Sequence, residues 1–248
     1  MNQIIKIAWV CICVLLFLGC FNPEDYDTPL ASADKISFIS ENITNVPADG
    51  INTGLVKVRI SDKASPGRRT VVFKTSSGFF IGGKGDSIAV TAAESFSASA
   101  QLANLNATTA IVTAKIINVT TLGNLTITFV RVYPATISVA VDSFSVAKDY
   151  KGETIITATL RIENGGKPSI GHPVQFTVTR PSNPAVGDFL NDKSIAITDA
   201  DGKAKIRYTP GATEPGYATV TASTIISVPG NSTAQGSTTS AATRIYIR

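Results

Sequence analysis

Strict alternation of apolar and polar residues constrains the fold of this chain more than any other feature of its sequence. In Val56–Ile60, for example, three apolar residues are separated by Lys57 and Arg59. A period of two is typical of β-strands with one buried and one solvated face. The same alternation runs through 110–116 and 156–162, and helical periodicity is scarce beyond residue 35. The chain is therefore expected to be all-β, with antiparallel strands packed as sandwiches.

The alternating pattern occurs twice, which indicates a duplicated domain. The matching segments are VRISDKASPGRRTVVF (58–73) with LRIENGGKPSIGHPVQF (160–176), SSGFF (76–80) with AVGDF (185–189), and AIVTAKI (110–116) with ATVTAST (218–224). The offset between the copies drifts from 102 residues (Val58 to Leu160) to 109 (Phe80 to Phe189). We therefore expect two domains, at 35–133 and 134–248, which meet near Tyr133-Pro134-Ala135 with almost no linker and form a fairly stiff rod.

Short motifs make these two copies resemble a known family. The first copy contains Ala48-Asp49-Gly50, and the second contains TDADGKA at Thr198–Ala204, whereas TAAES at Thr91–Ser95 takes the place of that hairpin in the first copy. Together they resemble the bacterial Ig-like repeats of the invasin/intimin type. The resemblance implies two tandem Ig-like antiparallel β-sandwiches. It also implies a spacer or adhesive role without catalysis, so the chain is not expected to be an enzyme.

The N-terminal segment has the proportions of a signal peptide. A short polar start with Lys6 precedes the apolar core Ile7–Leu18, which is shorter than the roughly 20 apolar residues of a membrane-spanning helix. Phe17-Leu18-Gly19-Cys20 resembles the lipobox of bacterial lipoproteins, although Ala or Ser is commoner at the position of Leu18. This resemblance implies cleavage after residue 19 and attachment of lipid to Cys20. An uncleaved N-terminal anchor is the alternative.

The segment after the cysteine is acidic and rich in turn-forming residues. We interpret residues 20–34 as a tether, because Glu24, Asp25 and Asp27 follow Cys20 closely. These residues resemble the signal that sends some lipoproteins of Bacteroides-like bacteria to the cell surface. We therefore expect an outer-membrane lipoprotein exposed on the cell surface; an orientation toward the periplasm is the alternative.

Charge and residue types argue against several other classes of function. The 22 basic and 18 acidic residues form no basic block, so no nucleic-acid partner is expected. His172 is the single histidine, and a zinc site needs several ligands. Asp199-Ala200-Asp201-Gly202 begins like a calcium loop, but lysines follow, and Asp-Gly between alternating segments favours a hairpin. We therefore expect no metal, no catalytic residue and no cofactor.

Three further segments leave alternatives open. Phe79-Phe80 is interpreted as closing the core, with an exposed sugar-stacking ring as the alternative. The polar, low-complexity segment Ser227–Thr243 is predicted to be a long flexible loop between the last two strands. Asp86-Ser87-Ile88 resembles a short O-glycosylation sequon of Bacteroides-like bacteria, but Ser87 could simply begin a strand.

Seven strands that alternate in direction would place three loops of the second domain at its far end. These loops are Ser143–Glu153, Pro181–Lys193 and Pro210–Gly216, whereas His172, the Asp201 turn and Ser227–Thr243 would face the first domain. Because binding residues concentrate on loops held by a rigid scaffold, the candidate ligand residues are Asp149, Tyr150, Arg180, Asp188, Phe189 and Tyr217.

We therefore expect a lipid-anchored envelope protein that acts in adhesion or surface presentation. Its partners would be the membrane, through the lipid, and a host or neighbouring-cell protein or glycan. The alternatives are a glycan-binding accessory lipoprotein of a polysaccharide-uptake system, which would show exposed aromatic rings, and a structural periplasmic subunit, which would show pairable edge strands.

Overall fold

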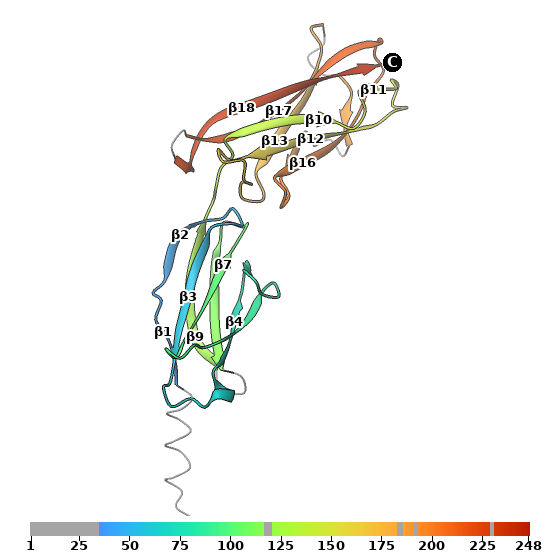
Figure 1. The fold of residues 1–248 in the computed structure, drawn as a ribbon. Coiled ribbons are helices and arrows are strands. Elements are labelled where there is room, and N and C mark those ends of the chain that lie inside the picture. The colour runs from blue at the N-terminus through green and yellow to red at the C-terminus, as the bar shows by residue number, and fades with distance from the viewer. Residues whose placement is uncertain (1–34, 117–120, 183–185, 191–192, 229–230) are drawn as a thin grey trace, which may run out of the picture.

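Two β-sandwiches stacked end to end make up the computed structural model of this chain (Figure 1). The structure describes residues 35–116, 121–182, 186–190, 193–228 and 231–248, without the side chains of 121–123 and 227–236. The predicted leader, Cys20 and the acidic tether lie outside the described residues. Strands β1–β9 form domain 1 and strands β10–β18 form domain 2. Within the described residues, no helix is long and apolar enough to span a membrane.

Domain 1 consists of a four-stranded sheet facing a five-stranded sheet. The four-stranded sheet has the order β1 (Ile36–Phe38), β3 (Thr53–Ile60), β7 (Ser97–Ala103), β5 (Phe79–Phe80). The five-stranded sheet has the order β2 (Ile43–Pro47), β9 (Thr121–Val130), β8 (Thr109–Ile116), β4 (Thr70–Thr75), β6 (Ser87–Thr91). A short 3-10 helix, η1 (Pro66–Arg68), precedes β4.

Domain 2 repeats this arrangement strand for strand. Its four-stranded sheet has the order β10 (Thr136–Val141), β12 (Thr154–Arg161), β16 (Lys203–Thr209), β14 (Asp188–Phe189). Its five-stranded sheet has the order β11 (Ser145–Val146), β18 (Asn231–Ile247), β17 (Gly216–Val228), β13 (Pro173–Thr179), β15 (Ile195–Ile197). All pairs are antiparallel except β2–β9 and β11–β18, which are parallel. The all-β fold class with two tandem Ig-like sandwiches is confirmed.

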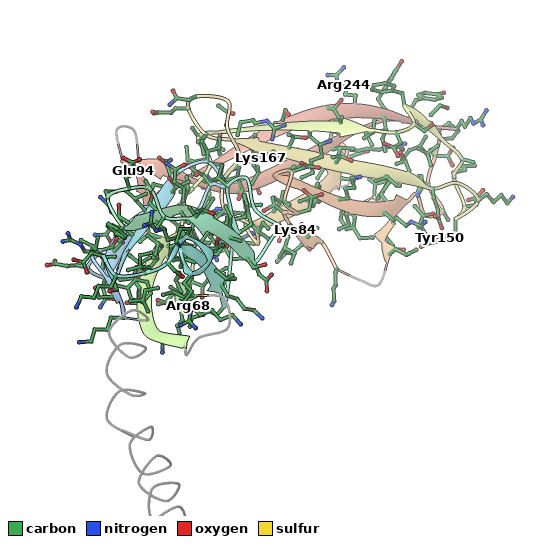
Figure 2. All side chains as sticks on the ribbon, turned by 60° about the horizontal axis from the view of Figure 1, so that its bottom comes forward. Arg68, Lys84, Glu94, Tyr150, Lys167 and Arg244 are labelled. Atoms are coloured by element: carbon green, nitrogen blue, oxygen red, sulfur yellow. The ribbon has the colours of Figure 1, made fainter. Side chains whose placement is uncertain are left out.

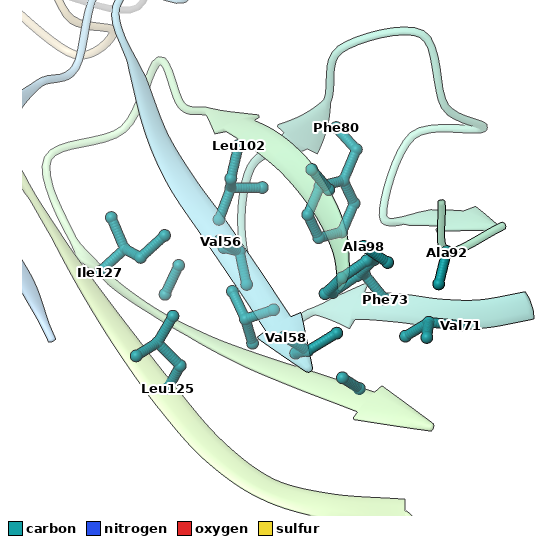
Figure 3. Packing of buried hydrophobic residues seen from close by; sticks show 14 of the residues in the cluster. Val56, Val58, Val71, Phe73, Phe80, Ala92, Ala98, Leu102, Leu125 and Ile127 are labelled. Carbon is teal, nitrogen blue, oxygen red and sulfur yellow. The ribbon is translucent and has the colours of Figure 1, made fainter. Parts of the chain in front are cut away.

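The alternation seen in the sequence produces the two hydrophobic cores. Along β3, Val56, Val58 and Ile60 are buried, whereas Lys57 and Arg59 are exposed. In domain 1 the ring of Phe80 is buried against that of Phe73, with 6.3 Å between ring centroids (Figure 3). The interpretation that Phe79-Phe80 closes the core is therefore confirmed for Phe80.

The prediction of a flexible loop over Ser227–Thr243 is wrong. Strands β17 and β18 form one long antiparallel hairpin, in which Thr221 pairs with Ala242 and Ser223 with Ser240. The hairpin extends beyond the pairing between β13 and β17, which ends at Ser223. Serine and threonine content therefore misled the prediction, because threonine is a good strand former and strand pairing satisfies the backbone.

The Asp199–Gly202 segment is a tight turn, as predicted, but it does not close a β-hairpin. The preceding strand β15 belongs to the five-stranded sheet and the following strand β16 to the four-stranded sheet, so the turn carries the chain between layers. Gly202 has φ +70°, and its amide donates to the carbonyl of Asp199. At the matching turn of domain 1, Phe96 adopts φ +54° and its amide donates to Ala93 in the same way.

Hydrogen bonds between buried groups hold the two domains together. The hydroxyl of Ser169 in domain 2 donates to the carbonyl of Ala48 in domain 1 at 2.7 Å and accepts from the amide of Val132 at 2.8 Å. The amide of Ile170 donates to the carbonyl of Leu105 at 3.0 Å. Ser169 is fully buried. Because these bonds join both domains to the connecting segment, the junction restrains bending.

His172 is buried at the same junction and should make domain 2 less stable in acid. Its Nε2 donates to the carbonyl of Val132 at 2.8 Å, and its ring lies edge-on to Tyr133. Burial lowers the pKa of His172, and the nearby guanidinium of Arg131 adds to this effect, whereas the bond to Val132 opposes it. The unfolded chain therefore binds the proton first as the pH falls below about 6.5.

We expect the free energy of unfolding of domain 2 to be fully retained above pH 6.5. It should decline below that value by up to about 1.4 kcal/mol per pH unit, until the folded state also binds the proton. Denaturant unfolding at pH 7.5 and 5.5 measures this loss. His172→Gln, which can keep a donor toward Val132, should show a smaller pH dependence. An equal dependence in both proteins would contradict the assignment to His172.

Candidate binding surface at the distal end of domain 2

Three loops meet at the end of domain 2 farthest from domain 1. The amides of Asp149 and Tyr150 donate to the carbonyls of Gly211 and Pro210, at 3.1 and 2.9 Å. The phenol of Tyr150 donates to the carboxylate of Asp188 at 2.8 Å. Figure 2 places Tyr150 at this distal end. The described residues of segments 143–153, 181–193 and 210–216 therefore meet there, in the arrangement expected from strand direction.

Tyr150 occupies a backbone conformation that the first domain assigns to glycine. Gly50 has φ +76° and its amide donates to Asn104, in the same way that Tyr150 has φ +60° and its amide donates to Pro210. Asp149 is also left-handed, with φ +59°. Such conformations cost about 1–2 kcal/mol for a residue with a side chain. Because the fold can make this turn with glycine at the position of Tyr150, it does not require the tyrosine ring, which leaves exposed Tyr150 and the neighbouring Asp149 as functional candidates.

The ring of Tyr150 also connects the three loops. A side-chain carbon built on Gly211 would lie 3.1 Å from the Tyr150 hydroxyl, so the ring passes directly over this glycine. The hydrogen bond to Asp188, together with the charge of that carboxylate, raises the pKa of Tyr150. The phenol therefore stays protonated at neutral pH and remains a hydrogen-bond donor. The side chain is 61% exposed and available to a ligand.

Replacing Tyr150 with glycine should leave domain 2 at least as stable as the native protein. The variant loses the exposed hydrogen bond to Asp188, but glycine adopts this left-handed conformation without strain, as Gly50 does in domain 1. The free energy of unfolding should therefore change by no more than about 1 kcal/mol. Chemical denaturation of Tyr150→Gly measures it, with Tyr150→Phe as the control that removes only the hydroxyl. A loss above about 2 kcal/mol would mean that the ring is structural.

Two of the sequence-predicted residues serve the scaffold. The guanidinium of Arg180 donates to the hydroxyl of Thr213 at 3.2 Å and to the carbonyls of Glu214 and Gly216 at 2.6 and 3.0 Å. It therefore fixes the loop that leads into β17. Phe189 is half-buried and packs on the core with its ring 5.8 Å from that of Tyr208. The polar contacts of Arg180 and the packing of Phe189 therefore serve the scaffold, whereas Tyr150 and Asp188 form an exposed pair.

Tyr217 lies on the outer face of the five-stranded sheet. It is 68% exposed and pairs across the strands with Tyr246, with ring centroids 5.2 Å apart. The sequence prediction missed Tyr246 and the exposed Phe144, whose carbonyl accepts from the amide of Tyr246. Alternation could have revealed Tyr246, because Ile245 and Ile247 are buried on either side of it.

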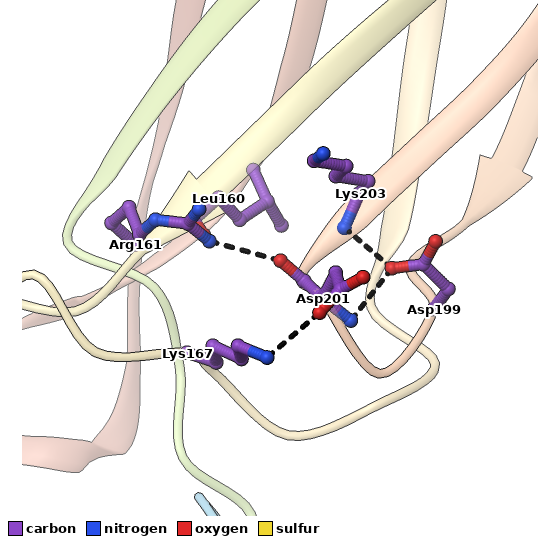
Figure 4. A network of polar contacts seen from close by, with 6 residues as sticks. All are labelled: Leu160, Arg161, Lys167, Asp199, Asp201 and Lys203. Carbon is purple, nitrogen blue, oxygen red and sulfur yellow. Dashed lines mark hydrogen bonds and ion pairs between the residues drawn. The ribbon is translucent and has the colours of Figure 1, made fainter.

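The acidic turn near domain 1 has no arrangement suited to a cation. The carboxylate of Asp201 accepts from Lys167 at 2.7 Å, which lowers the pKa of Asp201 (Figure 4). One carboxylate oxygen of Asp199 accepts from the amides of Asp201 and Lys203, so it caps the turn. Within the described residues, no three His, Cys, Asp or Glu side chains form a group that could hold a metal ion.

Comparison with solved structures identifies the fold of both domains. Invasin, a bacterial integrin-binding protein, is 22% identical, with 86% of this chain and 38% of that chain covered and a TM-score of 0.51. The fold is that of invasin-type Ig-like domains. The D0-D1 domains of intimin are 20% identical, covering 86% of this chain and 97% of that one, with a TM-score of 0.32. The Yersinia pseudotuberculosis adhesin InvE is 18% identical, covering 88% and 60%, with a TM-score of 0.47.

This chain covers only part of the length of the longer proteins that share its fold. This chain spans about two fifths of the invasin chain and three fifths of the InvE chain. No protein-family model matches the sequence, and no curated protein matches it. The likeness therefore concerns the fold.

Proposed function

We propose that this protein is a lipid-anchored adhesion or presentation protein of the outer membrane, displayed on the cell surface. Lipid on Cys20 would hold the chain, residues 20–34 would act as the tether, and domain 1 would act as a spacer. The distal end of domain 2 would then contact a protein or glycan of a host or a neighbouring cell. No catalytic step is proposed.

The observation that carries this proposal is the exposed pair Asp149-Tyr150 at the distal end, where hydrogen bonds join it to two other loops. Domain 1 has Gly50 at the position of Tyr150, so the fold does not require an exposed tyrosine there. The hydrogen bonds of Ser169 give further support, because they join domain 2 to domain 1 at the end opposite this pair. The placement of binding residues on loops of a rigid scaffold is the usual one.

Protease treatment of intact cells tests the proposed location. The native chain should be cleaved by an added protease while a periplasmic marker protein stays intact, and Cys20→Ser should leave the membrane fraction. Protection of the native chain until the envelope is opened would contradict surface display. A structural role in the periplasm would then be favoured, and the exposed edges of the β17–β18 hairpin would be its first candidate contacts.

A further inference from the structure

Domain 2 carries exposed aromatic rings where domain 1 carries threonines. Strand pairing makes the positions equivalent: Tyr217 pairs with Tyr246 between β17 and β18, as Thr109 pairs with Thr128 between β8 and β9. In domain 1 this pair is a hydroxyl contact at 3.4 Å. The same scaffold is therefore stable with threonine at both positions, so the fold does not require the two tyrosine rings.

A third exposed aromatic residue is bonded to this pair through the backbone, because the carbonyl of Phe144 accepts from the amide of Tyr246 at 2.7 Å. Phe144 is 68% exposed. Exposed aromatic rings that gather at one place, without a packing role, indicate a binding surface.

Positive charge accompanies these rings. Arg244 and Tyr246 in β18, and Arg248 directly after it, alternate with the buried Ile245 and Ile247, so all three are exposed on the outer side of the sheet. Figure 2 shows Arg244 at the surface of domain 2, toward the end that carries Tyr150. The described strands of this five-stranded sheet contain no acidic residue, and Arg244 is the single charged residue within them. The face can therefore approach an anion without repulsion from carboxylates of its own strands.

Hydroxyl groups lie beside these side chains on the outer face. They belong to Thr179, Thr219, Thr221, Ser223 and Ser240, which are exposed or half-exposed. Hydroxyls can donate and accept hydrogen bonds. Tyrosine rings offer apolar faces with a polar tip, and guanidinium groups bind carboxylate and related oxyanions through paired N–H donors. A ligand that matches all three has apolar faces, many hydroxyls and negative charges along an extended chain.

We propose that the aromatic-arginine face, defined as Tyr217, Arg244, Tyr246 and Arg248, binds an anionic polysaccharide. Sugar rings would stack on the tyrosines, and carboxylate or sulfate groups would pair with the two arginines. This inference builds on the proposed role of the distal end and names the chemistry of its ligand. The face lies beside the loops that contain Tyr150. Of its residues, the sequence analysis predicted only Tyr217 as a candidate.

Calorimetric titration of the full chain, purified in detergent micelles, tests the proposal. The probes are dextran, carboxymethyl dextran and dextran sulfate, which share one backbone and differ in charged group. We expect binding to at least one anionic dextran and none to neutral dextran, and the two anionic probes distinguish carboxylate from sulfate recognition. The double variant Tyr217→Thr/Tyr246→Thr, which installs the residues of domain 1, should bind about tenfold more weakly.

Two charge variants separate a specific site from simple ion pairing. Arg244→Thr, which installs the residue of the equivalent Thr126, should weaken binding by about tenfold. Arg59→Thr removes the same charge from β3 of domain 1 and should leave the affinity unchanged. Equal weakening by both arginine variants would overturn the proposal. Full affinity in the tyrosine double variant, equal binding of neutral dextran, or no binding to either anionic dextran would also overturn it.

The titration is independent of where the protein lies in the envelope. A protein that faces the periplasm would fail the protease experiment and could still bind the anionic dextrans. A protein exposed on the cell surface could pass the protease experiment and bind neither probe. The latter result would favour a protein partner at the same face.

Discussion

Replacing Gly78 with alanine should strongly destabilise domain 1 and leave the stability of domain 2 unchanged. Gly78 has φ +86°, and a side-chain carbon at this position would lie 2.4 Å from the carbonyl oxygen of Ala103. Both the backbone conformation and the contact are unfavourable, and the obstacle is main chain inside the sandwich rather than a movable side chain. We expect a loss of about 4 kcal/mol, a large part of the stability of a domain of this size.

In chemical denaturation followed by circular dichroism, the variant should show two separate transitions, whereas the transitions of the two domains should overlap in the native protein. Gly187→Ala is the counterpart in domain 2, because its new carbon would lie 2.4 Å from the carbonyl of Thr209. Gly82→Ala is the matched control: it has φ +74°, but no atom lies within 4 Å of the added carbon. If Gly78→Ala and Gly82→Ala lose the same stability, backbone conformation alone is responsible and the close contact is unimportant.

Replacing Ser169 with alanine should release the junction between the domains. The substitution removes both bonds of the hydroxyl and leaves the carbonyl of Ala48 and the amide of Val132 buried without that partner. Each unsatisfied group costs about 1–3 kcal/mol. The least costly way to solvate them is to separate the domains, so we expect bending at the junction, with the two sandwiches intact.

Distances between spin labels on the two domains, measured by pulsed electron resonance, test this expectation. The distribution should be narrow in the native protein and broad in Ser169→Ala. Ser143→Ala is a suitable control, because its hydroxyl bonds the nearby carbonyl of Ser145 at the opposite end of domain 2. A narrow distribution in Ser169→Ala would show that other contacts, such as that of Ile170 with Leu105, suffice to hold the junction.

The sequence was informative where side-chain burial controls structure. Alternation in strands such as Val56–Ile60 predicted which residues face the cores, and the offset between the copies predicted two similar sandwiches. The hairpin of β17 and β18 was missed, because its pairing depends on backbone bonds between two long segments with few large apolar residues. The turn at Asp199–Gly202 was found, but its sequence gave no indication that it joins two sheets.

Loop positions were easier to predict than the roles of side chains. Strand direction placed Tyr150 and Asp188 at one end, but it could not reveal that Phe189 turns inward or that Arg180 binds main-chain carbonyls. Tyr246 lies in a strand rather than a loop, so a search restricted to loops passed over it. Domain 1 has threonine at the positions of Tyr217 and Tyr246, so the difference between the two domains reveals rings that the fold does not require.

The parallel pairing of β2 with β9 determines how domain 1 carries a pulling force. The chain enters this domain through β1 and β2 and leaves it through β9 toward domain 2. Tension between the two ends draws these neighbouring strands in opposite directions along their length. The bonds that join them are then loaded together in shear, whereas a hairpin pulled at its open end loses its bonds one after another. A cell held by the distal end of this rod would therefore pull on domain 1 in its mechanically strong direction.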